Sequence, residues 1–88
     1  MNSRQKRTLK AVFTEPAPAN IDWSAIEGLF GALGAYLEEG NGSRVRVELE
    51  GVHATFHRPH PEREASRPQV RSVRQFLENA GIDSAEAD

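Results

Sequence analysis

The spacing of apolar residues changes period twice along this chain, and this change is what most constrains the fold. Residues 45–49 alternate apolar with charged side chains, and residues 52–57 alternate apolar side chains with His or Thr. An alternation of period 2 is typical of strands with one buried face. Glu50-Gly51 between the two runs predicts a two-residue hairpin turn. The flanking segments repeat near 3.6 residues, so we expect helices on both sides.

The hairpin turn also sets which residues lie opposite each other, because a two-residue loop fixes the register. Residue 49 then faces 52, 47 faces 54 and 45 faces 56 on the apolar side. The polar side carries three further cross-strand pairs, which are Glu48 with His53, Arg46 with Thr55, and Arg44 with His57. We therefore expect an Arg and a His side by side on the open face of the sheet.

A first amphipathic helix is expected before the sheet, with an apolar stripe at Trp23, Ile26, Leu29, Phe30 and Leu33. Ser24 and Glu27 read as its capping box, with Asn20 and Asp22 as alternative caps. Gly34 is well placed to end this helix with a positive φ. Residues 35–39 then form the expected first strand, and Gly40-Asn41-Gly42 the turn that follows it.

A second amphipathic helix follows the loop at residues 58–67. Ser66 and Gln69 read as a capping box, and Pro68 is tolerated in the first turn. Gly81 followed by Ile82 matches a left-handed helix end. The buried stripe is expected at Val70, Val73, Phe76, Leu77 and Ala80, while Arg71, Arg74 and Glu78 face solvent.

These elements predict a small α+β domain. Its order is α-β-β-β-α, with a three-stranded antiparallel sheet and both helices on one face. Residues 1–19 are a basic N-terminal segment, in which residues 3–13 are expected to form a short helix that packs only in part against the domain. The domain itself spans residues 20–82, and the acidic tail at residues 83–88 is expected to be disordered.

Composition narrows the function classes. The 88 residues contain no Cys, which excludes disulfide scaffolds and thiolate metal sites and suits a reducing cytoplasm. No apolar run approaches a membrane span, and residues 1–10 lack the apolar core of a signal peptide. The net charge of −2 argues mildly against nucleic-acid binding. Residues 44–76, however, contain seven Arg against four Glu, so the average hides a basic region.

All three histidines lie within eight residues, at His53, His57 and His60. Histidine exchanges protons near neutral pH, and adjacent Arg stabilises a phosphorane, so together they suffice for metal-free RNA cleavage. The alternative is that exposed strand positions simply tolerate His. A three-histidine metal site is a weaker alternative, because no carboxylate or Cys stands at a conventional ligand spacing. Arg67, Arg71 and Arg74 either follow a phosphate backbone or solvate a helix.

Residues 21–82 resemble the HicA family of toxins from bacterial toxin–antitoxin systems. The resemblance rests on the helix ending in Leu33-Gly34, the turn Gly40-Asn41-Gly42-Ser43, the loop Phe56-His57-Arg58-Pro59-His60-Pro61 and the ending Phe76-Leu77-Glu78-Asn79-Ala80-Gly81-Ile82. It implies a fold like the double-stranded RNA-binding domain, cleavage of messenger RNA independent of the ribosome, and neutralisation by a cognate HicB-type antitoxin. No cofactor is implied.

The chain departs from the family at one position, where Arg44 replaces the usual catalytic His after the Gly-Ser pair. A guanidinium is permanently protonated and cannot act as an ordinary general base. We therefore predict His57 as the acid or base, Arg44 as a phosphate clamp, and His60 as a second catalytic candidate. Residues expected to contact RNA are Arg44, Arg46, His53, Arg58, Arg67, Arg71 and Arg74. The alternatives are an inert RNA-binding or antitoxin-binding module, and a structural partner with no role at RNA.

Overall fold

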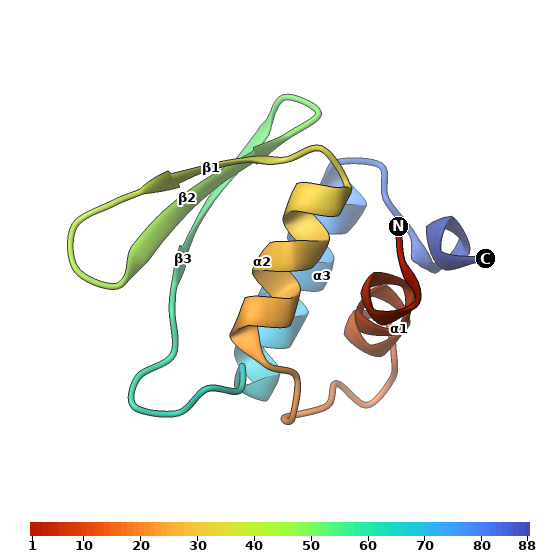
Figure 1. Ribbon diagram of the computed structural model, residues 1–88, viewed down its shortest axis with the longest axis horizontal. Coiled ribbons are helices and arrows are strands. Elements are labelled where there is room, and N and C mark those ends of the chain that lie inside the picture. Colours follow the sequence, from red (N-terminus) through yellow and green to blue (C-terminus); the bar gives the residue numbers. More distant parts are fainter.

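The computed structural model describes all 88 residues and has the expected α+β architecture (Figure 1). The elements follow in the order α1 (Ser3–Val12), α2 (Trp23–Ala32), β1 (Tyr36–Glu39), β2 (Arg44–Leu49), β3 (Val52–His57), α3 (Arg67–Asn79) and a short 3-10 helix, η1 (Ser84–Ala87). The three strands form one antiparallel sheet in the order β1-β2-β3. No helix is both long and apolar enough to cross a membrane.

The predicted hairpin register is confirmed at every position. Arg44 pairs with His57, and each following pair continues to Leu49 opposite Val52. The turn residues Glu50 and Gly51 have φ of 51° and 78°. Two consecutive positive φ angles define the type I′ turn that matches the right-handed twist of paired strands. The hairpin therefore has the handedness that two adjacent strands require.

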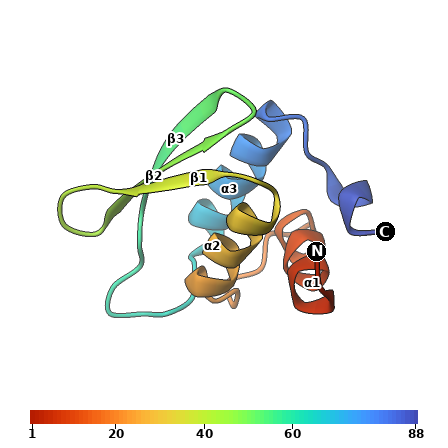
Figure 2. The ribbon, with the colours of Figure 1, turned by 45° about the horizontal axis from the view of Figure 1, so that its top comes forward.

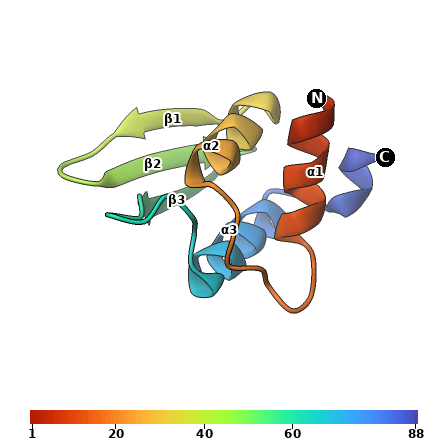
Figure 3. The ribbon, with the colours of Figure 1, turned by 60° about the horizontal axis from the view of Figure 1, so that its bottom comes forward.

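Helices α2 and α3 cover the same face of the sheet, as predicted (Figures 1 and 3). Between these layers lie four aromatic rings, Trp23 and Phe30 from α2, Phe56 from β3 and Phe76 from α3, whose neighbouring centroids are 5.6–5.8 Å apart. Tilted, stacked and edge-to-face contacts of this kind add to the free energy gained by burying the rings. The buried side chains of β2 and the apolar stripe of α3 complete this core.

The start of α3 agrees with the sequence prediction, and α2 begins after Asp22, one of its two alternative caps, rather than after Ser24. Ser66 and Gln69 form the reciprocal capping box at the start of α3. The predicted capping box of Ser24 with Glu27 is wrong, because Asp22 is the N-cap residue and makes no side-chain capping bond. The backbone N–H of Trp23 instead donates to the Arg63 carbonyl at 2.9 Å. The loop before α3 thus satisfies the start of α2.

The N-terminal segment is integrated into the fold, contrary to the expectation that it packs only in part. Leu9 and Val12 are fully buried, and α1 lies against the helices on the side away from the sheet (Figure 3). Arg74, expected to face solvent, keeps only 14% of its side chain exposed. Its guanidinium donates to the carbonyls of Val12 and Thr14, both at 2.8 Å, and forms an ion pair with Glu15.

The acidic tail also differs from the disordered segment that we expect from its composition. Ser84–Ala87 form η1, and the Ala87 side chain is buried with 4% exposure. This short helix lies beside α1 (Figure 2), and the Lys10 Nζ and Asp88 Oδ1 atoms are 3.7 Å apart. One apolar methyl group and the basic face of α1 are what give the tail a place to pack.

Arg58, directly after β3, connects three elements through two carboxylates. Its guanidinium donates to both Glu27 oxygens of α2, at 2.6 and 3.1 Å, and to both Glu39 oxygens of β1, at 2.7 and 2.6 Å. Glu27 also accepts from the Trp23 indole N–H. The hydrogen bond from Arg58 lowers the pKa of Glu39 below its ordinary value of 4.5, and bonds to Glu39 and Glu27 raise the pKa of Arg58. This cluster fixes where the loop after β3 begins.

We predict that Arg74→Met destabilises the protein by about 2 kcal/mol, because two backbone carbonyls and Glu15 lose a charged donor. Methionine keeps the aliphatic stem, so the change isolates the guanidinium. Arg71→Met is the matched control, since Arg71 is exposed and forms no ion pair, and its effect is expected to stay within about 0.5 kcal/mol. Urea unfolding followed by circular dichroism measures both. Equal stability of the two variants would contradict the role of Arg74.

A second prediction concerns acid unfolding. Because Arg58 lowers the Glu39 pKa below 4.5, the folded chain binds fewer protons than the unfolded chain around that pH. The stabilisation is present above pH 4.5 and is lost as the pH falls through the folded-state pKa. Glu39→Gln removes this contribution, so its urea midpoint varies less between about pH 5 and 3. Glu78→Gln, at a carboxylate outside any ion pair, is the control. If the urea midpoints of the parent and of Glu39→Gln changed equally with pH, the assignment of this pH dependence to Glu39 would be refuted.

Candidate nucleic-acid interface and active site

The face of the sheet opposite the helices carries three rows of polar side chains. The first row is Tyr36, Glu48 and His53, the second is Glu38, Arg46 and Thr55, and the third is Arg44 and His57. All eight residues are exposed. In the second row Arg46 Nε donates to Glu38 at 2.9 Å, and in the first row His53 Nδ1 lies 3.8 Å from a Glu48 oxygen. The first two rows therefore contain a carboxylate, and the third contains none.

The third row is held in place by backbone contacts at both ends. Arg44 follows the turn after β1, where the Gly40 N–H donates to the Arg44 carbonyl at 2.9 Å. A Cβ at Gly40 would come within 3.2 Å of the Arg44 Cβ, so glycine gives this close approach its room. On the other strand, Arg58 N–H donates to the Ser43 carbonyl at 2.9 Å and keeps the strand ends together.

The side chains of Arg44 and His57 are close because of the type of their pairing. In a two-residue hairpin the closing pair, Leu49 with Val52, exchanges hydrogen bonds, and hydrogen-bonded pairs then alternate with non-hydrogen-bonded ones. Arg44 and His57 form a non-hydrogen-bonded pair, in which Cα atoms approach to about 4.5 Å. Arg44 takes part in none of the ion pairs of the structure, so its charge remains free.

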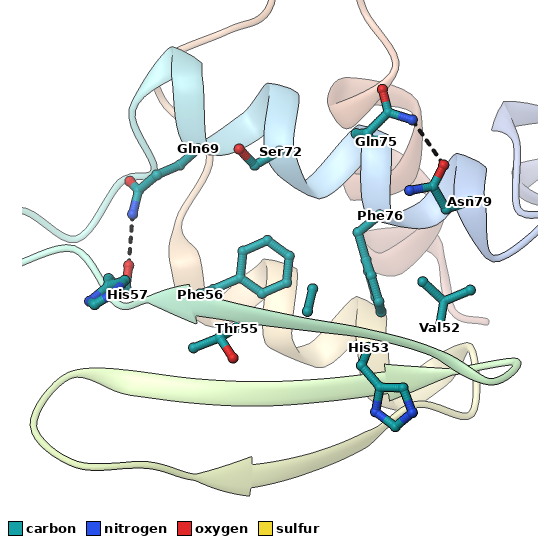
Figure 4. Close-up of a pocket in the computed structure, with 11 residues that line it drawn as sticks. Val52, His53, Thr55, Phe56, His57, Gln69, Ser72, Gln75, Phe76 and Asn79 are labelled. Carbon is teal, nitrogen blue, oxygen red and sulfur yellow. Dashed lines mark hydrogen bonds between the residues drawn. The ribbon is translucent and has the colours of Figure 1, made fainter.

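His60 lies in the loop between β3 and α3, and Gln69 connects this loop with His57. The Gln69 Nε2 atom donates to the His57 carbonyl at 2.7 Å (Figure 4). Gln69 also lines a cavity of about 350 Å³ together with His60, Pro59 and Ser66. Gln69 thus contacts the backbone of His57 and shares a cavity with His60. No group of three or more His, Asp or Glu side chains is arranged to hold a metal ion.

Several of the arginines expected to contact RNA have other partners in the structure. Arg58 is bound by two carboxylates, and Arg74 is bound to the N-terminal segment. Arg67 donates from Nε to the Ala17 carbonyl at 3.1 Å. Arg46 is paired with Glu38 but stays exposed, and Arg71 is exposed without an ion pair. Arg44, His57, Arg46 and His53 are brought together on one face, whereas Arg67, Arg71 and Arg74 belong to α3.

Sequence reasoning missed three contributors to the site. Gln69 appears in the sequence only as a capping residue, yet its amide also fixes the end of β3. Glu27 and Glu39 have no local signal, since they lie 31 and 19 residues from Arg58. A Glu in a helix and a Glu at a strand end are ordinary surface residues until the fold places an Arg between them.

The arrangement can bind an anion and exchange a proton. Arg44 supplies a permanent positive charge, and the exposed His57 supplies an imidazole, a group that can accept or donate a proton. A phosphodiester is the ligand that suits both groups, because its charge pairs with the guanidinium while the imidazole reaches an attacking or leaving oxygen.

Comparison with known proteins gives one match. The family model described as "HicA toxin of bacterial toxin-antitoxin" matches residues 23–82. That range begins at the first residue of α2 and includes the whole sheet and α3, so α1 and η1 lie outside it. Neither a curated protein nor a solved structure matches the chain. Since the matched range covers more than half of the 88 residues, the chain belongs to the HicA family of toxins of bacterial toxin–antitoxin systems.

Proposed function

We propose that this protein is the RNA-cleaving toxin of a toxin–antitoxin pair, acting in the cytoplasm on messenger RNA without a metal ion. Family membership supports a toxin with an RNA substrate and an antitoxin partner in general. The observation that carries the specific proposal is the third row of the sheet, where Arg44 and His57 pair without a carboxylate. In the other rows Arg46 is paired with Glu38 and His53 lies beside Glu48, so these rows suit phosphate less well.

In the proposed reaction, Arg44 holds the scissile phosphate and His57 removes the proton of the neighbouring 2′-hydroxyl. The 2′ oxygen forms a bond to phosphorus, the bond from phosphorus to the 5′ oxygen breaks, and that oxygen takes a proton from an imidazolium. The products are a 2′,3′-cyclic phosphate and a free 5′-hydroxyl. His57 itself, after accepting the first proton, or His60 in the adjacent loop supplies the second. Arg46, His53, Arg67 and Arg71 are the remaining exposed groups proposed to contact RNA.

A second candidate function follows from Arg44 itself, which stands where the family usually carries its catalytic His. A guanidinium cannot accept a proton, so the chain is alternatively an inert module that binds RNA or a HicB-type antitoxin. The two functions share the phosphate contacts and differ only in proton transfer. They are separated by whether purified protein shortens RNA, because both give RNA binding that weakens with salt.

We predict that His57→Ala lowers the rate of RNA cleavage by about 10²–10⁴-fold, the usual contribution of a positioned acid or base. Cleavage of total RNA by purified protein under saturating conditions is the measurement. His53→Ala is the matched control on the same strand, and it is expected to weaken RNA binding while leaving the saturated rate nearly unchanged. If His57→Ala cleaved RNA as fast as the parent, His57 would have no catalytic role.

Substitution at Arg44 separates binding from chemistry. We predict that Arg44→Ala weakens cleavage about 10²–10³-fold, because the developing phosphorane charge loses its fixed partner. Arg44→His restores the proton-transfer group usual in the family and is expected to cleave faster than the parent. Cleavage by Arg44→His together with an inactive parent would establish the inert-module function for the natural sequence. No cleavage by either protein would refute the catalytic assignment of this row.

A further inference from the structure

The outer edge of β3 pairs with no other strand and borders a groove against α3. The sheet ends at β3, so the backbone groups on its outer side have no strand partner. In the hairpin, Val52, Ala54 and Phe56 direct their N–H and C=O groups toward β2. The groups of His53, Thr55 and His57 therefore point outward. The hydrogen bond from Gln69 to the His57 carbonyl is the one contact made to them.

The groove beside this edge has a volume of about 430 Å³ (Figure 4). Phe56 and Phe76 lie at its base, between the strand and the helix. Its α3 wall is a row of uncharged polar side chains, Gln69, Ser72, Gln75 and Asn79. Gln75 and Asn79 bond to each other at 3.0 Å, and Gln69 is bound to His57, so none of them closes the edge between His53 and Thr55.

The two edges of the sheet differ in how they are protected against another strand. Edge strands are commonly guarded by charged residues, by Pro or by being short. β1 has four residues and carries Glu38 and Glu39. β3 has six residues and contains no Lys, Pro or bulge, so it presents a longer and unguarded row of donors and acceptors.

We propose that this edge is a docking site for an extended segment of a partner protein, which adds a fourth, antiparallel strand beside β3. The backbone of the added strand bonds to His53, Thr55 and His57, and its alternate side chains point to the open face and to the groove. Acidic residues suit the open face, where they lie opposite His53 and His57 and one strand away from the free charge of Arg44. Small apolar residues suit the side of the groove, over Phe76 and Val52.

Two other occupants fit the edge less well. A second copy pairing β3 with β3 around Thr55 would set His53 of one copy against His57 of the other, so neither histidine would face an acid across the new pairing. RNA would find no Lys or Arg among the eleven residues that line the groove. Naming the antitoxin as the natural source of the strand rests on the proposed function, whereas the strand site itself does not.

The test uses the full chain and an acetylated, amidated hexapeptide of alternating Glu and Val. In the added strand the Glu residues face the open side and direct their N–H groups toward β3, while those of Val point away. We expect the amide signals of His53, Thr55 and His57 to shift in nuclear magnetic resonance titrations. Methylating the backbone nitrogens of two Glu residues should weaken binding about tenfold, while methylating those of two Val residues should leave it nearly unchanged.

Variants of the chain test the same geometry from the other side. Thr55→Pro removes an outward N–H without breaking the ladder to β2, a position where edge strands tolerate Pro, and should weaken peptide binding at least about tenfold. Thr55→Val keeps the N–H and is the control. Ser72→Arg fills the groove from α3 and leaves the sequence of β3 unchanged. It should also weaken peptide binding, and it provides the test if Thr55→Pro is unstable.

Three results would overturn the inference. The first is no peptide binding by the parent, or equal binding by the parent, Thr55→Pro and Ser72→Arg. The second is a concentration-dependent dimer that Thr55→Pro abolishes. The third is a short oligouridylate that displaces the peptide and shifts the same three amides. RNA cleavage by these preparations is measured separately, so a chain that binds the peptide at Thr55 but cuts no RNA refutes the nuclease and supports the strand site.

Discussion

The register of the β2–β3 hairpin determines both the core and the candidate site. Because side chains alternate across a strand, a slip of one residue would turn Arg44 and His57 toward α2 and α3 and expose Val45 and Phe56. Burying an unpaired guanidinium costs several kcal/mol or more, which exceeds the roughly 1.5–3 kcal/mol gained by burying a large apolar side chain. The alternating pattern and the type I′ turn at Glu50-Gly51 together exclude that slip. The aromatic cluster around Phe56 depends on the resulting register.

The arginines divide into those that hold the fold together and those that remain free. Arg58 joins α2, β1 and the loop after β3, and Arg74 holds the segment between α1 and α2. A guanidinium suits both tasks, since its planar set of donors satisfies several oxygens at once. Arg44 lacks such partners. The uneven charge of the sequence therefore overstates the cationic surface, because Arg58 and Arg74 are bound by carboxylates and carbonyls, whereas Arg44 beside His57 and Arg71 on α3 have no ion pair.

The parts predictable from sequence are those decided by neighbours in the chain. The hairpin register, the capping box at Ser66 and the positive φ of Gly34 all follow from local spacing, and the structure has each of them. The start of α2 and the packing of α1 do not follow from local spacing. Glu27 is drawn from its expected cap by Arg58, 31 residues away, and Arg74 reaches carbonyls about sixty residues away. Such contacts have no periodicity, so only the assembled fold reveals them.

The exchange of a histidine for Arg44 changes what the third row can do. A histidine there would bring a second proton-transfer group but a charge that vanishes above its pKa. In the proposed function, the permanent charge of a guanidinium keeps the attraction for phosphate constant, while proton transfer is assigned to His57 and the loop histidine. Under that proposal, affinity for RNA and the rate of cutting depend on different side chains. A partner strand docked along the edge formed by His53, Thr55 and His57, as we propose, lies directly beside the proposed proton-transfer group. Arg44, the proposed phosphate clamp, lies one strand further away, on β2.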